Sequence, residues 1–127
     1  MKRGRGRPRR EGADEEILNV ALEMLREKGY RDLTVDAVAE RAGVAKTTVY
    51  RRWPSKGALI AAALAPLAPP DSDDALLRET EQLLDGVDDL EVLRAIIQPR
   101  RAKLAQLIGN AQRADELLGA VVMRFVG

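Results

Sequence analysis

Cationic and hydroxyl side chains are concentrated in one short segment, residues 46–56, which reads KTTVYRRWPSK. Lysine and arginine donate hydrogen bonds to phosphate oxygens and to guanine edges, and threonine and tyrosine hydroxyls also bind phosphates. Contacts of this kind are noncovalent and need no activated nucleophile. The chemistry that the segment indicates is recognition of nucleic acid.

The rest of the composition points away from catalysis. The 127 residues include neither cysteine nor histidine, so the chain lacks disulfides, thiolate nucleophiles, imidazole bases and soft metal ligands. Ser55 and Ser72 are the two serines, and no histidine is available to activate them. No glycine-rich phosphate loop, paired-carboxylate signature or metal-ligand spacing is visible. We therefore expect no enzyme, no cofactor and no metal site.

Two short helices must position the cationic segment. The sequence predicts a helix from about Val35 to Ala42 capped by Thr34, a turn at Gly43, and a second helix that Pro54 ends. At about 100° per residue, one arc of this second helix carries Lys46, Thr47, Tyr50 and Arg51, and the opposite arc carries Ala45, Val49 and Trp53. This layout is a helix-turn-helix with one packing face and one face free to enter a DNA major groove.

Both lysines of the segment stand at predicted helix starts, where the helix dipole disfavours a cation. Lys46 begins the second helix, and Lys56 begins the following one, which runs to about Ala65 with Ser55 as its cap. A phosphate or a base edge nearby would resolve both conflicts. The alternative is that the two side chains are simply solvated.

Residues 17–64 resemble the DNA-binding domain of the tetracycline-repressor (TetR/AcrR) family of bacterial regulators, through ALEMLREKGYRDLTVDAVAERAGV followed by KTTVYRRWPSKGAL. The resemblance implies an all-α chain: a homeodomain-like helix-turn-helix domain followed by a helical, truncated C-terminal domain. It implies that bases are read by Lys46, Thr47 and Arg51. It also implies that the DNA backbone is bound by Thr34, Thr48, Tyr50, Arg52 and Lys56. Ala45 departs from the family pattern, in which a serine often caps the recognition helix, and the lost cap should cost about 1 kcal/mol.

The first ten residues, MKRGRGRPRR, are basic and lack any acidic residue. We expect residues 1–12 to form a disordered arm. Its minor-groove candidates are Arg3, Arg5, Arg7, Arg9 and Arg10. The run Arg5-Gly6-Arg7-Pro8 is similar to the core of an AT-hook, which lies in A·T-rich minor grooves. A generic basic tail that binds any phosphate is the alternative.

Charge divides the chain into two parts. Residues 1–56 hold 14 Lys and Arg against 9 Asp and Glu, a balance of +5, and the remaining residues hold 7 against 11, a balance of −4. Only the first part is therefore expected to bind nucleic acid.

The proline-rich segment Pro66–Asp74 predicts a domain boundary. Before it we expect a helix-turn-helix domain at residues 13–65, whose first helix starts near Asp14. After it we expect a partial ligand-binding and dimerisation domain at residues 74–127.

The second domain is predicted to be helical throughout. We expect one helix from Ala75 to about Gln98 with an interruption near Gly86, a second from Pro99 to about Gln112, and a third from Asp115 to Val126. The last helix carries an apolar set that needs a covering partner: Leu117, Leu118, Val121, Val122 and Phe125. By the resemblance, the later helices that form the family's dimer interface would provide this cover. We therefore expect the chain to be a fragment or a truncated product. We also expect the 127 residues alone to form a monomer or a non-native oligomer.

The expected function is repression of transcription by a homodimer on a pseudo-palindromic operator, with double-stranded DNA and a small-molecule effector as partners. Two rivals remain open: a DNA-binding protein without a sensor, and a helical interaction module whose basic arm binds RNA or an acidic protein. No apolar run approaches the roughly 20 residues that span a bilayer, so we expect a cytoplasmic, nucleoid-associated protein without a membrane partner.

Overall fold

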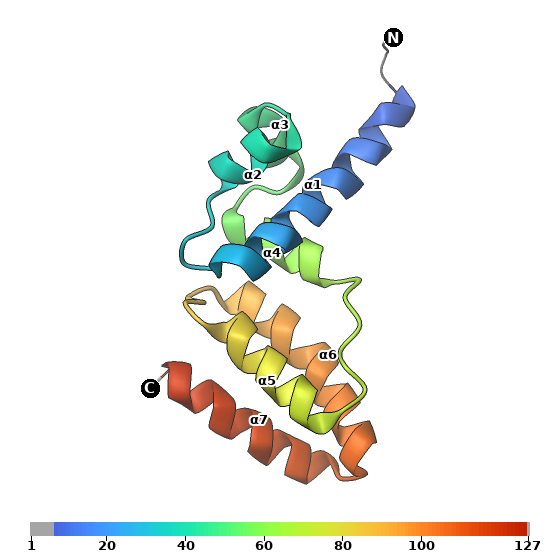
Figure 1. The fold of residues 1–127 in the computed structure, drawn as a ribbon, viewed down its shortest axis with the longest axis vertical. Helices are drawn as coiled ribbons and strands as arrows, with labels where there is room; N and C mark the ends of the chain where they lie inside the picture. The colour runs from blue at the N-terminus through green and yellow to red at the C-terminus, as the bar shows by residue number, and fades with distance from the viewer. Residues whose placement is uncertain (1–6, 127) are drawn as a thin grey trace.

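The computed structural model describes the backbone of residues 7–126 and the side chains of residues 12–123. Within these residues it contains seven α-helices and no strand, which confirms the all-α prediction. The helices, shown in Figure 1, are α1 (Arg7–Lys28), α2 (Val35–Ala42), α3 (Lys46–Arg52), α4 (Lys56–Leu64), α5 (Asp73–Leu84), α6 (Leu90–Ile108) and α7 (Ala111–Val126).

Helices α1 to α4 form the first half of the molecule. The long helix α1 packs against α2 and α4, and α2 packs against α3. Four apolar side chains of α1 at helical spacing are buried, namely Ile17, Ala21, Met24 and Leu25. They meet Val38 of α2, Val49 of α3 and Leu59 of α4, all fully buried. The apolar face predicted for the first helix is therefore its core face.

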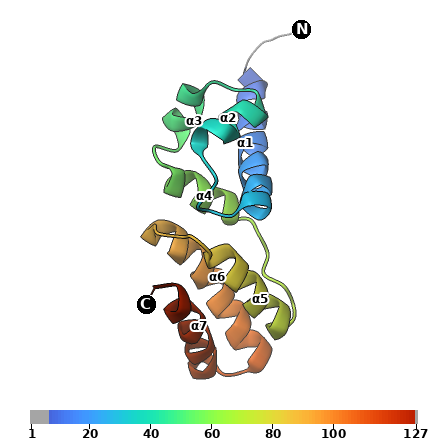
Figure 2. The same ribbon diagram turned by 60° about the vertical axis from the view of Figure 1, so that its left-hand side comes forward.

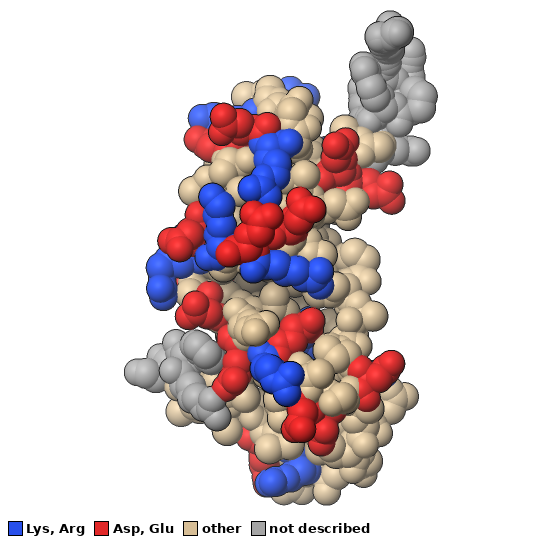
Figure 3. Space-filling model, in the orientation of Figure 1, with Lys and Arg blue, Asp and Glu red and all other residues tan. Residues whose placement is uncertain are grey.

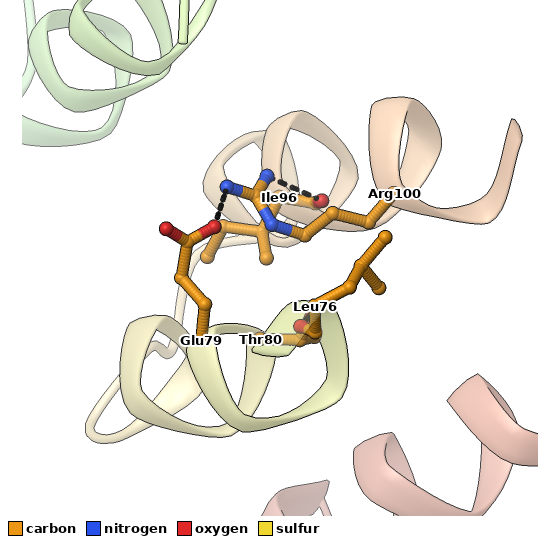
Figure 4. A network of polar contacts seen from close by, with 5 residues as sticks. All are labelled: Leu76, Glu79, Thr80, Ile96 and Arg100. Carbon is orange, nitrogen blue, oxygen red and sulfur yellow. Dashed lines mark hydrogen bonds and ion pairs between the residues drawn. The ribbon is translucent and has the colours of Figure 1, made fainter. Parts of the chain in front are cut away.

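Helices α5 to α7 form the second half, in which α6 packs against both α5 and α7. Its centre holds a buried cation, Arg100 of α6, whose side chain is 1% exposed. Arg100 Nη2 donates to Glu79 Oε1 at 2.7 Å, and Nη1 donates to the carbonyl of Ile96 at 3.0 Å (Figure 4). On α5, the Thr80 hydroxyl donates to the carbonyl of Leu76 at 2.7 Å. The buried polar side chains Thr80 and Arg100 thus bond to carbonyl groups of their own helices and to Glu79.

The two halves share one hydrophobic core. Helix α4 packs against α6 as extensively as it packs against α1. Leu84 of α5 and Val92 and Ile96 of α6 belong to the same buried cluster as Ile17 and Ile60 of the first half. A smaller cluster around Leu76, Leu104, Ala114 and Leu118 lies within the second half alone. The segment between α4 and α5 runs along the outside of the molecule (Figures 1 and 2).

Three predicted helix starts differ from the structure by four residues or more. Helix α1 begins at Arg7 rather than near Asp14, so residues 7–12, which were assigned to the arm, are helical. Proline is tolerated in the first turn of a helix, where Pro8 lies, because the N–H groups there have no intrahelical acceptor. Arginine has high helix propensity, so the basic residues extend the helix. Residues 1–6 lie outside the described residues.

The other two differences lie in the second half. Pro99 was expected to begin a helix but lies inside α6, where proline removes one backbone hydrogen bond. Packing of α6 between α5 and α7 and the bond from Arg100 to the Ile96 carbonyl favour the continuous helix. Helix α6 ends at Gly109, which has the left-handed conformation with φ +69°. Helix α7 begins at Ala111 rather than at Asp115. The earlier start is explained by Asn110, whose side-chain oxygen accepts a hydrogen bond from the Arg113 N–H at 2.9 Å and so caps the helix.

Candidate nucleic-acid interface

Local capping fixes the two helices of the interface. The Thr34 hydroxyl accepts from the Ala37 N–H at 3.1 Å and caps α2, as predicted. Gly43 ends α2 with φ +74°, and the Val44 N–H donates to the Ala39 carbonyl at 3.0 Å. A residue with a side chain would be strained at that φ, so glycine is required for the sharp turn into α3.

The exposed face of α3 carries the side chains that the sequence assigns to base reading. Lys46, Thr47 and Arg51 are all exposed, and so is Tyr50, which is 42% exposed. On the other face Val49 is fully buried, and Trp53 is partly buried against the core. The predicted division of α3 into a packing face and a free face is confirmed for these residues.

Ala45 is the exception on the packing face. It was expected to point inward with Val49, but it is exposed. The reason is its position: Ala45 is the cap residue of α3, with extended backbone angles of φ −71° and ψ 145°, so it does not follow the helical periodicity. No side chain caps α3, as the absence of a serine there implied.

Several cations near this face are paired with acidic side chains of the first half. Lys46 Nζ lies 3.5 Å from Asp36 Oδ2 of α2, and Arg52 Nη2 lies 2.6 Å from Asp14 Oδ2 of α1. Arg41 of α2 lies 3.1 Å from Glu27 of α1. In Figure 3 basic and acidic side chains accordingly alternate over this half of the molecule. Exposed pairs of this type contribute only about 0 to 1 kcal/mol, so a DNA phosphate can displace the carboxylate.

The pair with Asp36 explains how a cation is tolerated at the start of α3. The Lys46 ammonium is offset by Asp36 within the same chain, rather than by a phosphate alone. Asp36 also occupies the first turn of α2, where an acidic side chain is favourable. The position of Lys46 signalled that a partner was needed, but its identity depends on how α2 and α3 meet in space.

Lys56 is also held within the chain. Its Nζ lies 4.0 Å from the centroid of the Tyr30 ring, a cation–π contact. Burial lowers the pKa of Lys56, while the nearby carboxylates of Asp88 and Asp32 act in the opposite direction. The predicted cap of α4 is present, with the Ser55 hydroxyl accepting from the Ala58 N–H at 3.0 Å. The interaction with Tyr30 gave no signal in the sequence because the two residues are far apart in the chain.

A cleft of about 910 Å³ brings several of the predicted residues together. It is lined on one side by Thr48, Arg51 and Arg52 of α3 and on the other by Asp14 and neighbouring residues of α1. Thr48 is half-buried and Arg52 is exposed. Thr34, at the start of α2, is not among the residues that line this cleft. Its hydroxyl oxygen accepts a hydrogen bond from the Ala37 N–H, and the hydroxyl hydrogen can still be donated to another group.

The arm residues divide between two regions. Arg7, Arg9 and Arg10 lie in the first turns of α1, which project away from the helix-turn-helix unit (Figure 1). Arg3 and Arg5 lie outside the described residues. Further along α1, Asp14 lines the same cleft as Arg51 and Arg52 of α3.

No helix in the described part of the chain combines the length and apolar character needed to cross a membrane. No group of three or more acidic side chains in that part is placed to hold a metal ion.

The first half is similar to known bacterial regulatory proteins. The family model described as "Bacterial regulatory proteins, tetR family" matches residues 17–63. The HTH-type transcriptional regulator YdeS of Bacillus subtilis is 50% identical over 60 residues, 47% of this chain and 30% of YdeS. The DNA-binding transcriptional repressor TetR of Mycobacteroides abscessus is 50% identical over 48 residues, 38% of this chain and 25% of that repressor.

A longer similarity covers both halves. An HTH-type transcriptional regulator of Mycobacterium bovis is 28% identical over 108 residues, 76% of this chain and 57% of that regulator. The chain thus spans less than two thirds of the length of each of these relatives. The matched residues 17–63 contain α2, the Gly43 turn and α3 in full, together with most of α1 and α4. Over residues 17–63 the chain is similar to the tetR family of bacterial regulatory proteins.

Proposed function

We propose that this protein is a sequence-specific DNA-binding repressor of transcription whose helix α3 enters the major groove. The observation that supports it best is the free face of α3, on which Lys46, Thr47, Tyr50 and Arg51 are exposed while Val49 anchors the opposite face. A helix of this kind fits the width of the B-DNA major groove. Repression is inferred from the similarity to the M. abscessus repressor.

Within this proposal the side chains divide into two groups. Lys46, Thr47 and Arg51 read base edges, and Arg51 is the residue suited to bidentate contact with guanine. The phosphate contacts come from Thr34, Thr48, Tyr50, Arg52 and Lys56. The first group sets sequence preference and the second sets general affinity and register.

The second half, residues 74–127, is proposed to serve effector binding and dimerisation. A homodimer with two reading heads fits a pseudo-palindromic operator, and a small molecule that changes their spacing relieves repression. The similarity of residues 17–63 to the tetR family supports these assignments. A cytoplasmic location beside the nucleoid follows from the same proposal.

Competition binding tests the central claim. Fluorescence anisotropy would compare a duplex from the region upstream of the gene with a random duplex and with RNA of equal length. We expect tightest binding to one upstream duplex and weakest binding to RNA. Equal affinity for RNA and duplex DNA would reject the proposal in favour of a general polyanion binder.

Two variants test the division of roles. Arg51→Ala should cost about 1 to 3 kcal/mol on the preferred duplex and less on a random one. Lys56→Met removes the charge but keeps the apolar stem over Tyr30, and it should weaken all duplexes alike and reduce the salt slope by about one. Equal losses on both duplexes for Arg51→Ala would remove Arg51 from the base-reading group.

The arm is proposed to bind the minor groove beside the operator through Arg3, Arg5, Arg7, Arg9 and Arg10. Deleting residues 2–6 tests this without shortening α1, which begins at Arg7. Binding should weaken most where A·T pairs flank the site, because arginines favour narrow minor grooves. A loss independent of flanking composition would identify a generic basic tail instead.

A further inference from the structure

A polar layer interrupts the apolar core of the second half. Thr80 of α5 and Arg100 of α6 are 0% and 1% exposed, and they are the two buried residues with polar or charged side chains in the described part of the chain. On α6, Arg100 lies one helical turn from Ile96 of the larger apolar cluster and one turn from Leu104 of the smaller cluster. On α5, Thr80 lies one turn from Leu76, which also belongs to the smaller cluster. The layer therefore stands between two apolar regions.

The hydrogen bonds of this layer leave one donor open. The Thr80 hydroxyl donates to the Leu76 carbonyl, Arg100 Nη1 donates to the Ile96 carbonyl, and Arg100 Nη2 donates to Glu79 Oε1 (Figure 4). Arg100 Nε is buried and has no hydrogen-bond partner among the described residues. A buried donor on a cation is costly to leave without an acceptor, so this atom calls for a functional explanation.

The open donor belongs to the edge of the guanidinium that binds carboxylates best. The N–H of Nε and one N–H of Nη2 are parallel, and together they can donate to the two oxygens of one carboxylate. Glu79 uses this edge through Nη2 alone. The edge is thus only half used by the chain's own anion.

Glu79 is the member of the ion pair that can reach solvent. Its side chain is 26% exposed, whereas that of Arg100 is 1% exposed. The Glu79 carboxylate can therefore turn towards water, while the guanidinium stays buried and needs another anion. Because Glu79 connects Arg100 with solvent, a small anion can approach Arg100 from the same side.

We propose that Arg100 anchors a binding site for a short aliphatic carboxylate, whose two oxygens accept from Nε and Nη2 while Glu79 turns to solvent. The inference rests on the proposed role of the second half in effector binding, and it names the chemical class of the effector. Exchange of one carboxylate for another keeps the buried cation neutralised and adds a hydrogen bond at Nε. The aliphatic tail suits the apolar clusters on both sides of the layer.

The same geometry disfavours two related classes of ligand. A neutral amide of equal size cannot neutralise Arg100 once Glu79 has turned away. A dicarboxylate would bring a second negative charge into the layer, and Arg100 is the one buried cation of the described residues. The site should therefore select a single carboxylate with an apolar tail.

Calorimetric titration of the native chain with butyrate tests the site, at constant ionic strength set with sodium chloride. Butyramide and succinate are the comparison ligands, because the first lacks the charge and the second carries two. We expect saturable binding of one butyrate per chain. Butyramide and succinate should bind at least roughly tenfold more weakly, the factor expected for one hydrogen bond to a charged group.

Three variants assign the binding to the polar layer. Glu79→Gln removes the competing anion and should bind butyrate roughly tenfold more tightly than the native chain, a gain that a purely structural ion pair would not give. Arg100→Met should abolish binding. Arg101→Met is the matched control, since Arg101 is exposed and paired with Asp115, and it should bind butyrate as the native chain does. Circular dichroism checks that each variant is folded, and the titration of the native chain decides even if Glu79→Gln unfolds.

The outcomes separate the site from the proposed function. Lack of saturable butyrate binding to the native chain would overturn the site, and so would butyrate binding that Arg100→Met retains. Neither result would affect the proposed role of α3, because anisotropy measures DNA binding without butyrate. If butyrate binds through Arg100 but leaves the affinity for the upstream duplex unchanged, the carboxylate site stands and the effector role of the second half is wrong.

Discussion

The guanidinium of Arg52 lies 2.6 Å from the carboxylate of Asp14, so the last residue of α3 forms an ion pair with α1. The Asp14 side chain is 21% exposed and that of Arg52 is 53% exposed. The pair therefore has a dual character: it orients α1 relative to α3, and it neutralises a cation that is proposed to bind DNA. The first role favours stability, and the second opposes binding.

Asp14→Asn should separate these two roles. We expect the free energy of unfolding to fall by less than about 1 kcal/mol, the usual value of a partly exposed pair. Binding to specific and random duplexes should tighten together, because Arg52 is released for phosphate contact. Urea unfolding and anisotropy titrations measure the two effects. Glu15→Gln, an equal charge change at the next, exposed position, should leave DNA affinity closer to that of the native chain.

Gly57→Ala should destabilise the protein even though alanine is the better helix former. The new methyl group would overlap the carboxylate of Asp89, which caps α6 from the loop between α5 and α6, residues 85–89, so either this loop shifts or the cap is lost. Overpacking of this kind costs about 1 to 3 kcal/mol. Gly119→Ala is the control, since Gly119 lies inside α7 with no neighbouring atom within 4 Å of the added Cβ. That change should stabilise by about 0.5 to 1 kcal/mol in urea unfolding. Equal effects at the two glycines would show that the loop does not press on α4.

Replacing one partner of the Arg100–Glu79 pair should lower the free energy of unfolding more than replacing the other. Arg100 is 1% exposed, and its Nε has no hydrogen-bond partner, whereas the Glu79 side chain is 26% exposed. Glu79→Gln leaves a buried cation without its anion and should cost about 1 to 3 kcal/mol. Arg100→Met leaves a carboxylate that can reach water and fills the space with an apolar chain, so it should cost less than Glu79→Gln. Urea unfolding of both variants provides the comparison, and the reverse order would mean that the Ile96 carbonyl bond dominates.

Tyr30 should make the fold sensitive to high pH. Burial and the carboxylates of Asp89 and Asp88 raise its pKa to about 12, above the ordinary value of 10. A raised pKa means that the folded state favours the neutral phenol, so this stabilisation is complete below pH 10 and is lost as the pH rises towards 12. Tyrosinate absorbance should show one component near pH 12 that Tyr30→Phe removes. A titration of Tyr30 at its ordinary pKa would contradict the close approach of the loop.

Local signals predicted much of the first half. Thr34 and Ser55 cap α2 and α4 as expected, and Gly43 makes the turn, because these features depend on neighbouring residues in sequence. The start of α1 and the continuity of α6 through Pro99 were missed because packing and helix propagation outweighed the local breakers. The base-reading and phosphate-binding assignments stay predictions.

The pairing of charges could not be predicted from spacing. Asp36 and Lys46, or Asp14 and Arg52, are too far apart in sequence for helical periodicity to relate them. Each pair depends on the angle at which two helices cross, which the whole core determines. The sequence did indicate a need for a partner at Lys46 and Lys56, and the structure supplied Asp36 and Tyr30.

The continuous core between the halves limits how they can be exchanged between related proteins. A chimera that joins residues 1–65 to the second half of a relative would inherit Ile60 and Leu64 without the surfaces of α5 and α6 that bury them here. It would also need a loop that places a glycine against Arg31 and a capping carboxylate against Gly57. A chimera that folds must therefore keep the α5–α6 loop together with helices α1 to α4. The junction between the two parent sequences should then lie within α6 and not in the proline-rich segment.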